Sequence, residues 1–148
     1  MFGGLGLVLG GIAAVGLGLS LLAWPLINVV ETGKTPEYPA LLPRHYQISP
    51  EEVYEAVLLV VREVPHWRLT ASDSSLRTLH VESTTRFLRF VDDIDVRVEA
   101  DGDGAHVFVR SASRVGTGDF GQNARTIRAL FESLDRTLAR GATGTPLH

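Results

Sequence analysis

The segment IDVRVEADGDGAHVFVR, residues 94–110, decides the fold of this chain. Apolar and polar residues alternate on both sides of the tetrapeptide D-G-D-G at 101–104, which is a typical hairpin signal. Centring the turn on Gly102 and Asp103 keeps the apolar faces matched, pairing Ala100 with Ala105, Val98 with Val107 and Val96 with Val109. The sequence therefore predicts an antiparallel hairpin with one buried face.

Two further strands are expected before this hairpin, at residues 67–71 and 79–84, because apolar and polar residues alternate there as well. The first strand of the hairpin is expected to begin near Phe87, which would also bury Leu88 and Phe90. Short polar turns join these strands. The sequence therefore predicts a four-stranded antiparallel sheet.

A helix is expected on each side of the four strands. The segment S-P-E-E at residues 49–52 supplies an N-cap serine, a proline at the first helical position and the glutamate of a capping box. A second amphipathic helix is expected near residues 119–140, with Phe120 among its buried positions. The order α-β-β-β-β-α predicts a two-layer α+β domain with both helices on one face of the sheet.

The first thirty residues contain no charged side chain and are predicted to form a transmembrane anchor. About twenty apolar residues cross a bilayer core as a helix, and residues 5–24 supply them. A stripe of small residues would let another helix pack closely, at Gly6, Gly10, Ala14 and Gly18. A cleaved signal peptide is the alternative, but the segment lacks a basic start and a convincing cleavage site. We therefore expect a single-pass membrane protein, and the sequence leaves open which side its domain faces.

Three prolines at positions 36, 39 and 43 predict an extended linker rather than a helix over residues 31–48. This gives four segments along the chain. They are an anchor at 1–30, the linker at 31–48, the α+β domain at 49–141 and a flexible tail at 142–148.

Composition excludes several kinds of chemistry. The chain has no cysteine, which rules out disulfides and thiolate catalysis. Its net charge is −3, and no basic run or basic aromatic face favours nucleic acid as a partner. The five histidines show no metal-ligand spacing, so neither a metal nor a cofactor is expected.

The hairpin register predicts two groups of polar residues. The polar cluster lies on the helix-covered face and consists of Asp92, Ser111, Ser113 and Asn123. A buried carboxylate needs partners, so this cluster indicates either a closed network that ties the last helix to the sheet or a small ligand pocket. A bulge at residues 92–93 would instead move the first carboxylate to the surface. The ion ladder lies on the other face and consists of Asp93, Asp95, Arg110 and Arg114.

The segment G-T-G-D-F-G at residues 116–121 matches the GxGxxG pattern of dinucleotide-binding loops. That function needs a parallel βαβ unit, whereas here a hairpin strand precedes the helix and no strand follows it. The segment is expected to form a tight junction through Gly116, Gly118, Asp119 and Gly121. Asp119 is expected to cap the helix together with Gln122. An anion at the helix N-terminus is an alternative, although the Asp119 carboxylate would repel it.

The same residues carry a resemblance. The pattern R-S-x-S-R-x-G-x-x-D-x-G-x-N over residues 110–123, with F-x-D-D at 90–93, resembles the family called domain of unknown function 1499. R-H-Y at 44–46, P-E at 50–51 and P-x-W at 65–67 also match its layout. The resemblance covers residues 38–139 and implies one domain, often found behind an N-terminal hydrophobic segment. It implies no activity.

The leading functional hypothesis is a non-enzymatic accessory module of a membrane complex, with other membrane protein subunits as partners. A small-ligand or lipid-binding domain is the alternative, with its site at Asp92, Ser113 and Asn123. A hydrolase-like enzyme that uses Ser113 or Asp92 is a second alternative, although the sequence places no histidine as its base.

Overall fold

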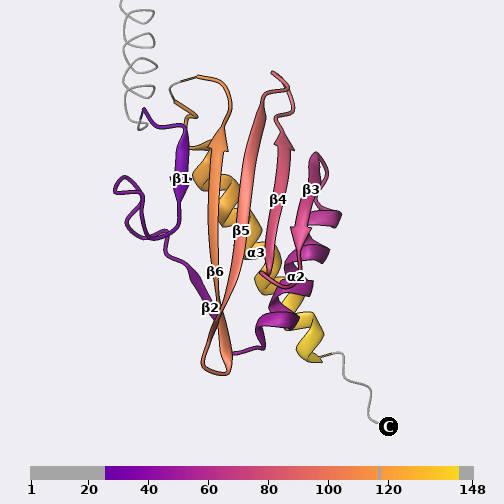
Figure 1. The fold of residues 1–148 in the computed structure, drawn as a ribbon. Helices are drawn as coiled ribbons and strands as arrows, with labels where there is room; N and C mark the ends of the chain where they lie inside the picture. Colours follow the sequence, from indigo (N-terminus) through magenta and orange to yellow (C-terminus); the bar gives the residue numbers. More distant parts are fainter. Residues whose placement is uncertain (1–25, 117, 144–148) are drawn as a thin grey trace, which may run out of the picture.

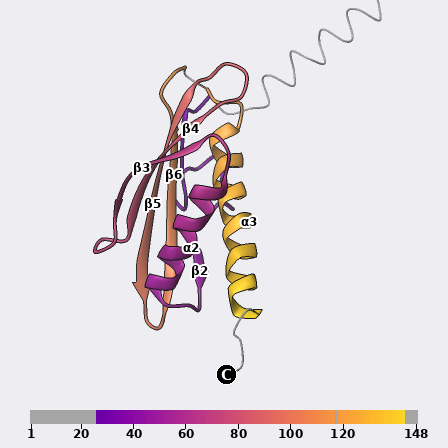
Figure 2. The same cartoon turned by 90° about the vertical axis from the view of Figure 1, so that its right-hand side faces the viewer.

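The computed structural model describes residues 26–116 and 118–143, and its central element is one six-stranded antiparallel sheet (Figure 1). The strands are β1 (Val29–Glu31), β2 (Arg44–Tyr46), β3 (Trp67–Asp73), β4 (Thr78–Thr84), β5 (Val91–Asp101) and β6 (Gly104–Ser113). Their order across the sheet is β1-β6-β5-β4-β3, and β2 pairs with β6 further along the same edge. The helices α2 (Pro50–Glu63) and α3 (Gln122–Thr143) cover one face of this sheet (Figure 2).

The central hairpin has the register predicted from its turn. Ala100 pairs with Ala105, and the pairing continues without a shift to Asp92 and Ser113. The β5–β6 ladder therefore contains no bulge at residues 92–93 that would turn Asp92 outward. Gly102, in the turn, has a φ of 57°, which a glycine adopts without strain.

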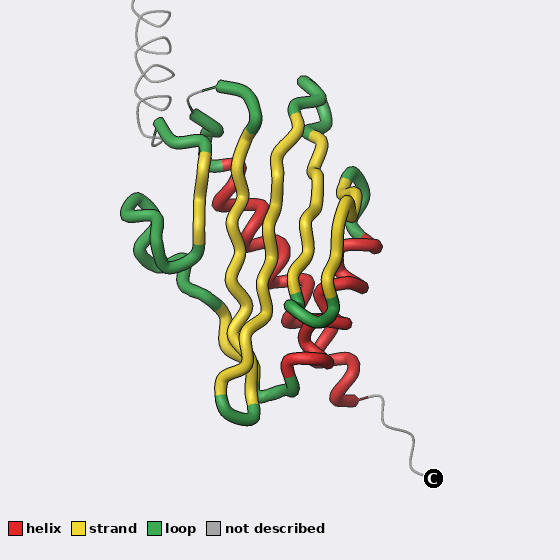
Figure 3. Tube along the Cα trace, in the orientation of Figure 1, coloured by secondary structure: helices red, strands yellow, loops and turns green. Residues whose placement is uncertain are grey.

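The core lies between the sheet and the two helices. Apolar side chains from both layers are almost completely buried there, including Val57, Val61, Val81, Ile94, Val107, Ile127, Phe131 and Leu134. Each such side chain stabilises the fold by roughly 1.5–3 kcal/mol relative to an exposed position. In Figure 3 the helices lie behind the strands, and the opposite face of the sheet is open. A ligand site on the helix side would have to displace packed side chains, whereas the open face is accessible.

Helix α2 begins at the predicted cap, whereas α3 begins at Gln122, three residues after Asp119. The Ser49 hydroxyl accepts a hydrogen bond from the Glu52 amide at 3.3 Å and donates one to the Glu52 carboxylate at 2.8 Å. Asp119 accepts from the amides of Gly121 and Asn123 at 2.9 and 2.7 Å. Asp119 therefore occupies the amides at the N-terminus of α3 with its own carboxylate.

The prediction of four strands is wrong, because the sheet has six. The two strands that were missed, β1 and β2, have three residues each and flank the proline-containing segment. Strands this short contain too few residues to reveal an alternating pattern. The first is held by burial of Val30, and the second by Asp135 of α3, which accepts hydrogen bonds from Arg44 at 2.8 Å and Tyr46 at 2.7 Å.

The prediction of a single-pass membrane protein is also corrected. Within residues 26–116 and 118–143, no helix has the length and hydropathy needed to cross a membrane. Val29 and Val30, which we assigned to the end of the anchor, instead form part of β1. The helix expected at residues 5–24, with the packing positions Gly6, Gly10, Ala14 and Gly18, lies outside the described residues. The boundaries assigned to the four segments stay predictions.

Three large apolar side chains expected in the core are exposed. Leu88 and Phe90 lie in the loop between β4 and β5, because β5 begins only at Val91. Phe120 precedes α3 and adopts a φ of 50°, which turns it out of the helical pattern. These apolar side chains belong to the loops at one end of the sheet rather than to its core.

Candidate functional site

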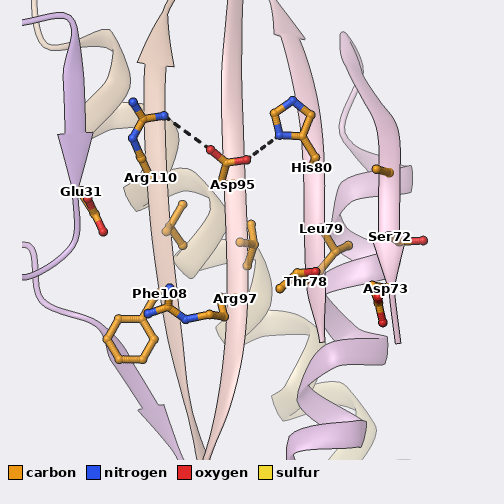
Figure 4. A pocket seen from close by; sticks show the side chains of 13 residues that line it. Glu31, Ser72, Asp73, Thr78, Leu79, His80, Asp95, Arg97, Phe108 and Arg110 are labelled. Carbon is orange, nitrogen blue, oxygen red and sulfur yellow. Dashed lines mark hydrogen bonds and ion pairs between the residues drawn. The ribbon is translucent and has the colours of Figure 1, made fainter. Parts of the chain in front are cut away.

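A hollow of about 380 Å³ lies on the face of the sheet opposite the helices (Figure 4). Residues from β1, β3, β4, β5 and β6 line it, so it spans the width of the sheet. Pockets for small ligands have volumes of roughly 300–1,000 Å³. We call this the open-face hollow and define it by six of its side chains, namely Glu31, His80, Asp95, Arg97, Phe108 and Arg110.

Arg110 is weakly paired in this hollow. Its Nη1 lies 3.5 Å from Asp95 Oδ2, at the outer limit of a hydrogen bond. The Asp95 carboxylate makes a much shorter contact with His80 Nδ1, at 2.5 Å. Glu31 is the β1 partner of Arg110 in the ladder, but its carboxylate pairs with Lys34 at 2.7 Å. Arg110 therefore lies between two carboxylates whose short contacts are with other residues, and its guanidinium keeps donors for a ligand.

The second arginine of the hollow, Arg97, already has interaction partners. Arg97 pairs with Glu99 at 2.5 Å, and its guanidinium carbon lies 4.8 Å from the centre of the Phe108 ring. The Phe108 ring gives the hollow an apolar side, whereas the side chains of Leu79, Val96 and Val109 are buried in the core behind the strands. The site thus combines one weakly paired cation with apolar surface.

The predicted ion ladder forms and is longer than expected. Arg114 binds Asp93 at 2.6 Å and Glu82 at 2.7 Å, and Glu82 also binds Arg68. Its further members follow along the open face, where His80 lies between Asp93 and Asp95, and Asp95 contacts Arg110.

Hydrogen bonds within this ladder shift the pKa values of its carboxyl groups. The hydrogen bond from Arg114 lowers the pKa of Asp93. The hydrogen bond from Arg68, followed by that from Arg114, lowers the pKa of Glu82. Both carboxylates raise the pKa of Arg114. The upper part of the ladder is therefore tightly paired, in contrast to Arg110.

The polar cluster is brought together on the helix-covered face. Ser111 donates a hydrogen bond to Asn123 Oδ1 at 2.5 Å, and Asn123 Nδ2 donates to Ser113 Oγ and to the Asn28 carbonyl, both at 3.0 Å. Asn123 and Ser111 are completely buried. The amide of Asn123 therefore joins α3, β6 and the segment before β1.

Asp92 completes this cluster with one unsatisfied atom. Its side chain is 2% exposed, and Oδ2 has no hydrogen-bond partner among the described residues. Burial raises the pKa of the Asp92 carboxyl, and a hydrogen bond with Ser113 partly opposes that shift. The three hollows described for this structure are lined by other residues. Ser113 shares its hydrogen bonds with Asn123 and Asp92, and no histidine is recorded among its partners in the described chain.

The junction before α3 contains two glycines in the left-handed region, Gly116 with a φ of 88° and Gly121 with a φ of 76°. The Gly116 carbonyl accepts a hydrogen bond from Asn28 Nδ2 at 2.9 Å. The junction is thus a backbone turn, and the hydrogen bond from Asn28 connects it to the segment before β1. In the described part of the chain, no group of three or more histidine or acidic side chains is arranged to hold a metal ion.

A family model described as "Protein of unknown function (DUF1499)" matches residues 25–134. The chain belongs to the DUF1499 family. The match confirms the resemblance found in the pattern at residues 110–123. It includes the whole open-face hollow and the polar cluster of this DUF1499 domain. No curated protein matches the sequence.

Three solved structures are similar to this DUF1499 domain. The crystal structure of Ara h 8.0201 has a TM-score of 0.52 and 11% identity, over 76% of this chain and 98% of that chain. The di-domain ARO/CYC BexL from the BE-7585A biosynthetic pathway has a TM-score of 0.47 and 16% identity, over 76% of this chain and 44% of that chain. TTHA0849 from Thermus thermophilus has a TM-score of 0.41 and 16% identity, over 79% and 99% of the two chains. At these identities the likeness to Ara h 8.0201 supports the fold alone.

Sequence reasoning missed several residues of the open-face hollow. The contact of His80 with Asp95 depends on the β4–β5 register, which pairs these two residues. Glu31 reaches the hollow only because β1 pairs with β6. Phe108 is an aromatic residue at an outward position of the predicted hairpin, and this position is the signal in the sequence for an apolar site on the open face.

Proposed function

We propose that this domain binds a small organic acid in the open-face hollow. The observation that carries the proposal is the incomplete pairing of Arg110, whose only recorded contact among the described side chains is at 3.5 Å. An arginine can form two parallel hydrogen bonds with a carboxylate, which makes it a specific anchor for an acid. A ligand carboxylate would complete the pairing of Arg110.

The lining of the hollow supports an acid with an apolar body. The Phe108 ring supplies an apolar surface in the same hollow as Arg110. Small-molecule sites commonly combine such surface with a few polar groups that fix the orientation of the ligand. A volume of about 380 Å³ suits a molecule of one or two rings.

The polar cluster is a weaker place for this ligand than the open-face hollow. The side chain of Asn123 already bonds Ser111 and Ser113, and the residue is completely buried. A ligand there would have to break these bonds, and every buried group left unpaired costs roughly 1–3 kcal/mol. We therefore assign ligand binding to the open face and a structural role to the cluster.

Titration with three probes followed by NMR tests this proposal. Benzoate, benzyl alcohol and benzylamine have the same ring and differ in charge. Benzoate should shift the amide signals of residues 79–80, 95–97 and 108–110 in a saturable manner, and benzyl alcohol should bind more weakly. Tighter binding of benzylamine than of benzoate, or shifts confined to the polar cluster, would contradict the assignment.

A further inference from the structure

A second hollow, of about 300 Å³, lies at the end of the sheet where β4 turns into β5. The first residues of β3 and the β4–β5 loop line it, and this loop is at the upper end of the sheet in Figure 1. We call it the loop hollow and define it by His66, Arg68, Glu82, Thr84, Arg86 and Arg89. It shares no lining residue with the open-face hollow.

The loop hollow is positively charged in a chain whose net charge is −3. Neither Arg86 nor Arg89 forms an ion pair with any residue that the structure describes. The described residues include the whole loop around these two arginines. Glu82 is the only acidic side chain in the lining, and two arginines, Arg68 and Arg114, already bind it. Two arginine side chains therefore line the same hollow without a carboxylate partner.

Backbone hydrogen bonds fix the loop that holds these two arginines. The Thr85 amide donates to the Phe90 carbonyl at 2.8 Å, and the Phe90 amide donates to Thr85 Oγ1 at 2.9 Å. The Thr84 amide donates to the His66 carbonyl at 3.0 Å, which joins the loop to the start of β3. Arg89 has a φ of 55°, a conformation that persists in a non-glycine residue only when the surroundings hold it. The loop is therefore closed at its base, and Arg86, Arg89 and His66 all line the loop hollow.

We propose that the loop hollow binds a phosphate group, either as the free anion or as part of a small organic phosphate. Arginine guanidinium groups match phosphate oxygens in geometry and charge. Arg86 and Arg89 would each donate to the phosphate oxygens. The Thr85 hydroxyl accepts from the Phe90 amide and keeps its own proton for a further bond.

NMR titration of the full chain with inorganic phosphate and with phenyl phosphate tests this site at fixed, low ionic strength. Both probes should shift the signals of the Thr84 and Thr85 amides and of the Arg86 and Arg89 side chains. Arg86→Gln combined with Arg89→Gln should weaken binding at least tenfold. Arg136→Gln combined with Arg62→Gln is the matched control, because it removes two charges from the exposed helix surfaces and should change affinity less than twofold.

Each outcome decides the proposal. Tighter binding of phenyl phosphate than of phosphate supports an organic phosphate as the ligand, and equal binding supports the free anion. Absence of saturable shifts in the loop would overturn the site. An equal loss in the control variant would overturn it too, because the attraction would then reflect net charge alone. An unchanged far-ultraviolet circular dichroism spectrum of each variant would establish that the loss of binding is not due to unfolding.

Discussion

Asn123 Nδ2 donates a hydrogen bond to Ser113 Oγ across 3.0 Å and so fastens the first turn of α3 to the end of β6. The same side chain accepts from Ser111 and donates to the carbonyl of Asn28. One buried amide therefore holds a helix, a central strand and the segment that leads into the edge strand β1.

Asn123→Ala should destabilise the domain by about 2–4 kcal/mol, because it leaves the buried Ser111 hydroxyl, the half-buried Ser113 hydroxyl and the Asn28 carbonyl without this partner. Urea unfolding measures the change. Gln122→Ala, at the neighbouring position of the same helix, should cost less than about 1 kcal/mol. A similar loss in both variants would show that the amide network adds nothing to the stability of the helix end.

Asp92 should make stability depend on pH. Burial raises the pKa of this carboxyl in the folded chain. The contribution of such a group to stability is complete below its ordinary pKa and is lost as pH rises through the raised value. Asp92→Asn cannot ionise, so its stability relative to the parent should increase between about pH 4 and about pH 7. Urea unfolding at the two pH values measures this, and a difference that does not change with pH would contradict the inference.

The ion ladder makes a prediction about two carboxyl groups. Arg114→Gln should raise the pKa of both Asp93 and Glu82, since its guanidinium binds both. Arg68→Gln should raise the pKa of Glu82 and leave that of Asp93 close to its parent value. Carboxyl carbon signals followed by NMR during a pH titration distinguish the two variants. Equal shifts of both groups in Arg68→Gln would be inconsistent with the observed pairing.

Much of the fold could be predicted because the central hairpin has a strong turn signal. The D-G-D-G turn determines the register, and the register places Asp92 opposite Ser113 and Asp95 opposite Arg110. The capping residues Ser49 and Asp119 were recognisable for the same reason, since caps depend on residues close in sequence. The hairpin turn and the capping residues therefore predict the middle of the sheet and the approximate starts of both helices.

The edge strands could not be predicted from such signals. Strand β1 follows a long apolar segment, so Val30 resembled the end of that segment rather than part of a strand. Strand β2 has no apolar alternation, and its position depends on contacts from Arg44 and Tyr46 to Asp135, about ninety residues away in the chain. The sequence therefore could not predict the part of the open-face hollow that Glu31 of β1 supplies.

Gly104 tests the attachment of β2. A Cβ atom at this position would lie 2.5 Å from the Tyr46 carbonyl oxygen and 2.9 Å from His45 Nε2. Gly104→Ala should therefore push β2 away from β6 and destabilise the domain by about 1–3 kcal/mol. Gly141→Ala is the control, because a Cβ there meets nothing within 4 Å, and it should stabilise α3 by roughly 0.5–1 kcal/mol. Thermal unfolding compares them, and equal midpoints in parent and Gly104→Ala would contradict the close approach of β2.

The affinity of Arg110→Gln for benzoate tests the central claim most directly. A hydrogen bond to a charged group contributes about 1.5–3 kcal/mol, which corresponds to roughly a ten- to hundredfold change in affinity. Calorimetric titration should therefore show at least tenfold weaker binding in Arg110→Gln and unchanged binding in Arg62→Gln, whose position lies on the helix side of the domain. Equal affinity of the parent and Arg110→Gln for benzoate would contradict the assignment of the open-face hollow as an acid-binding site.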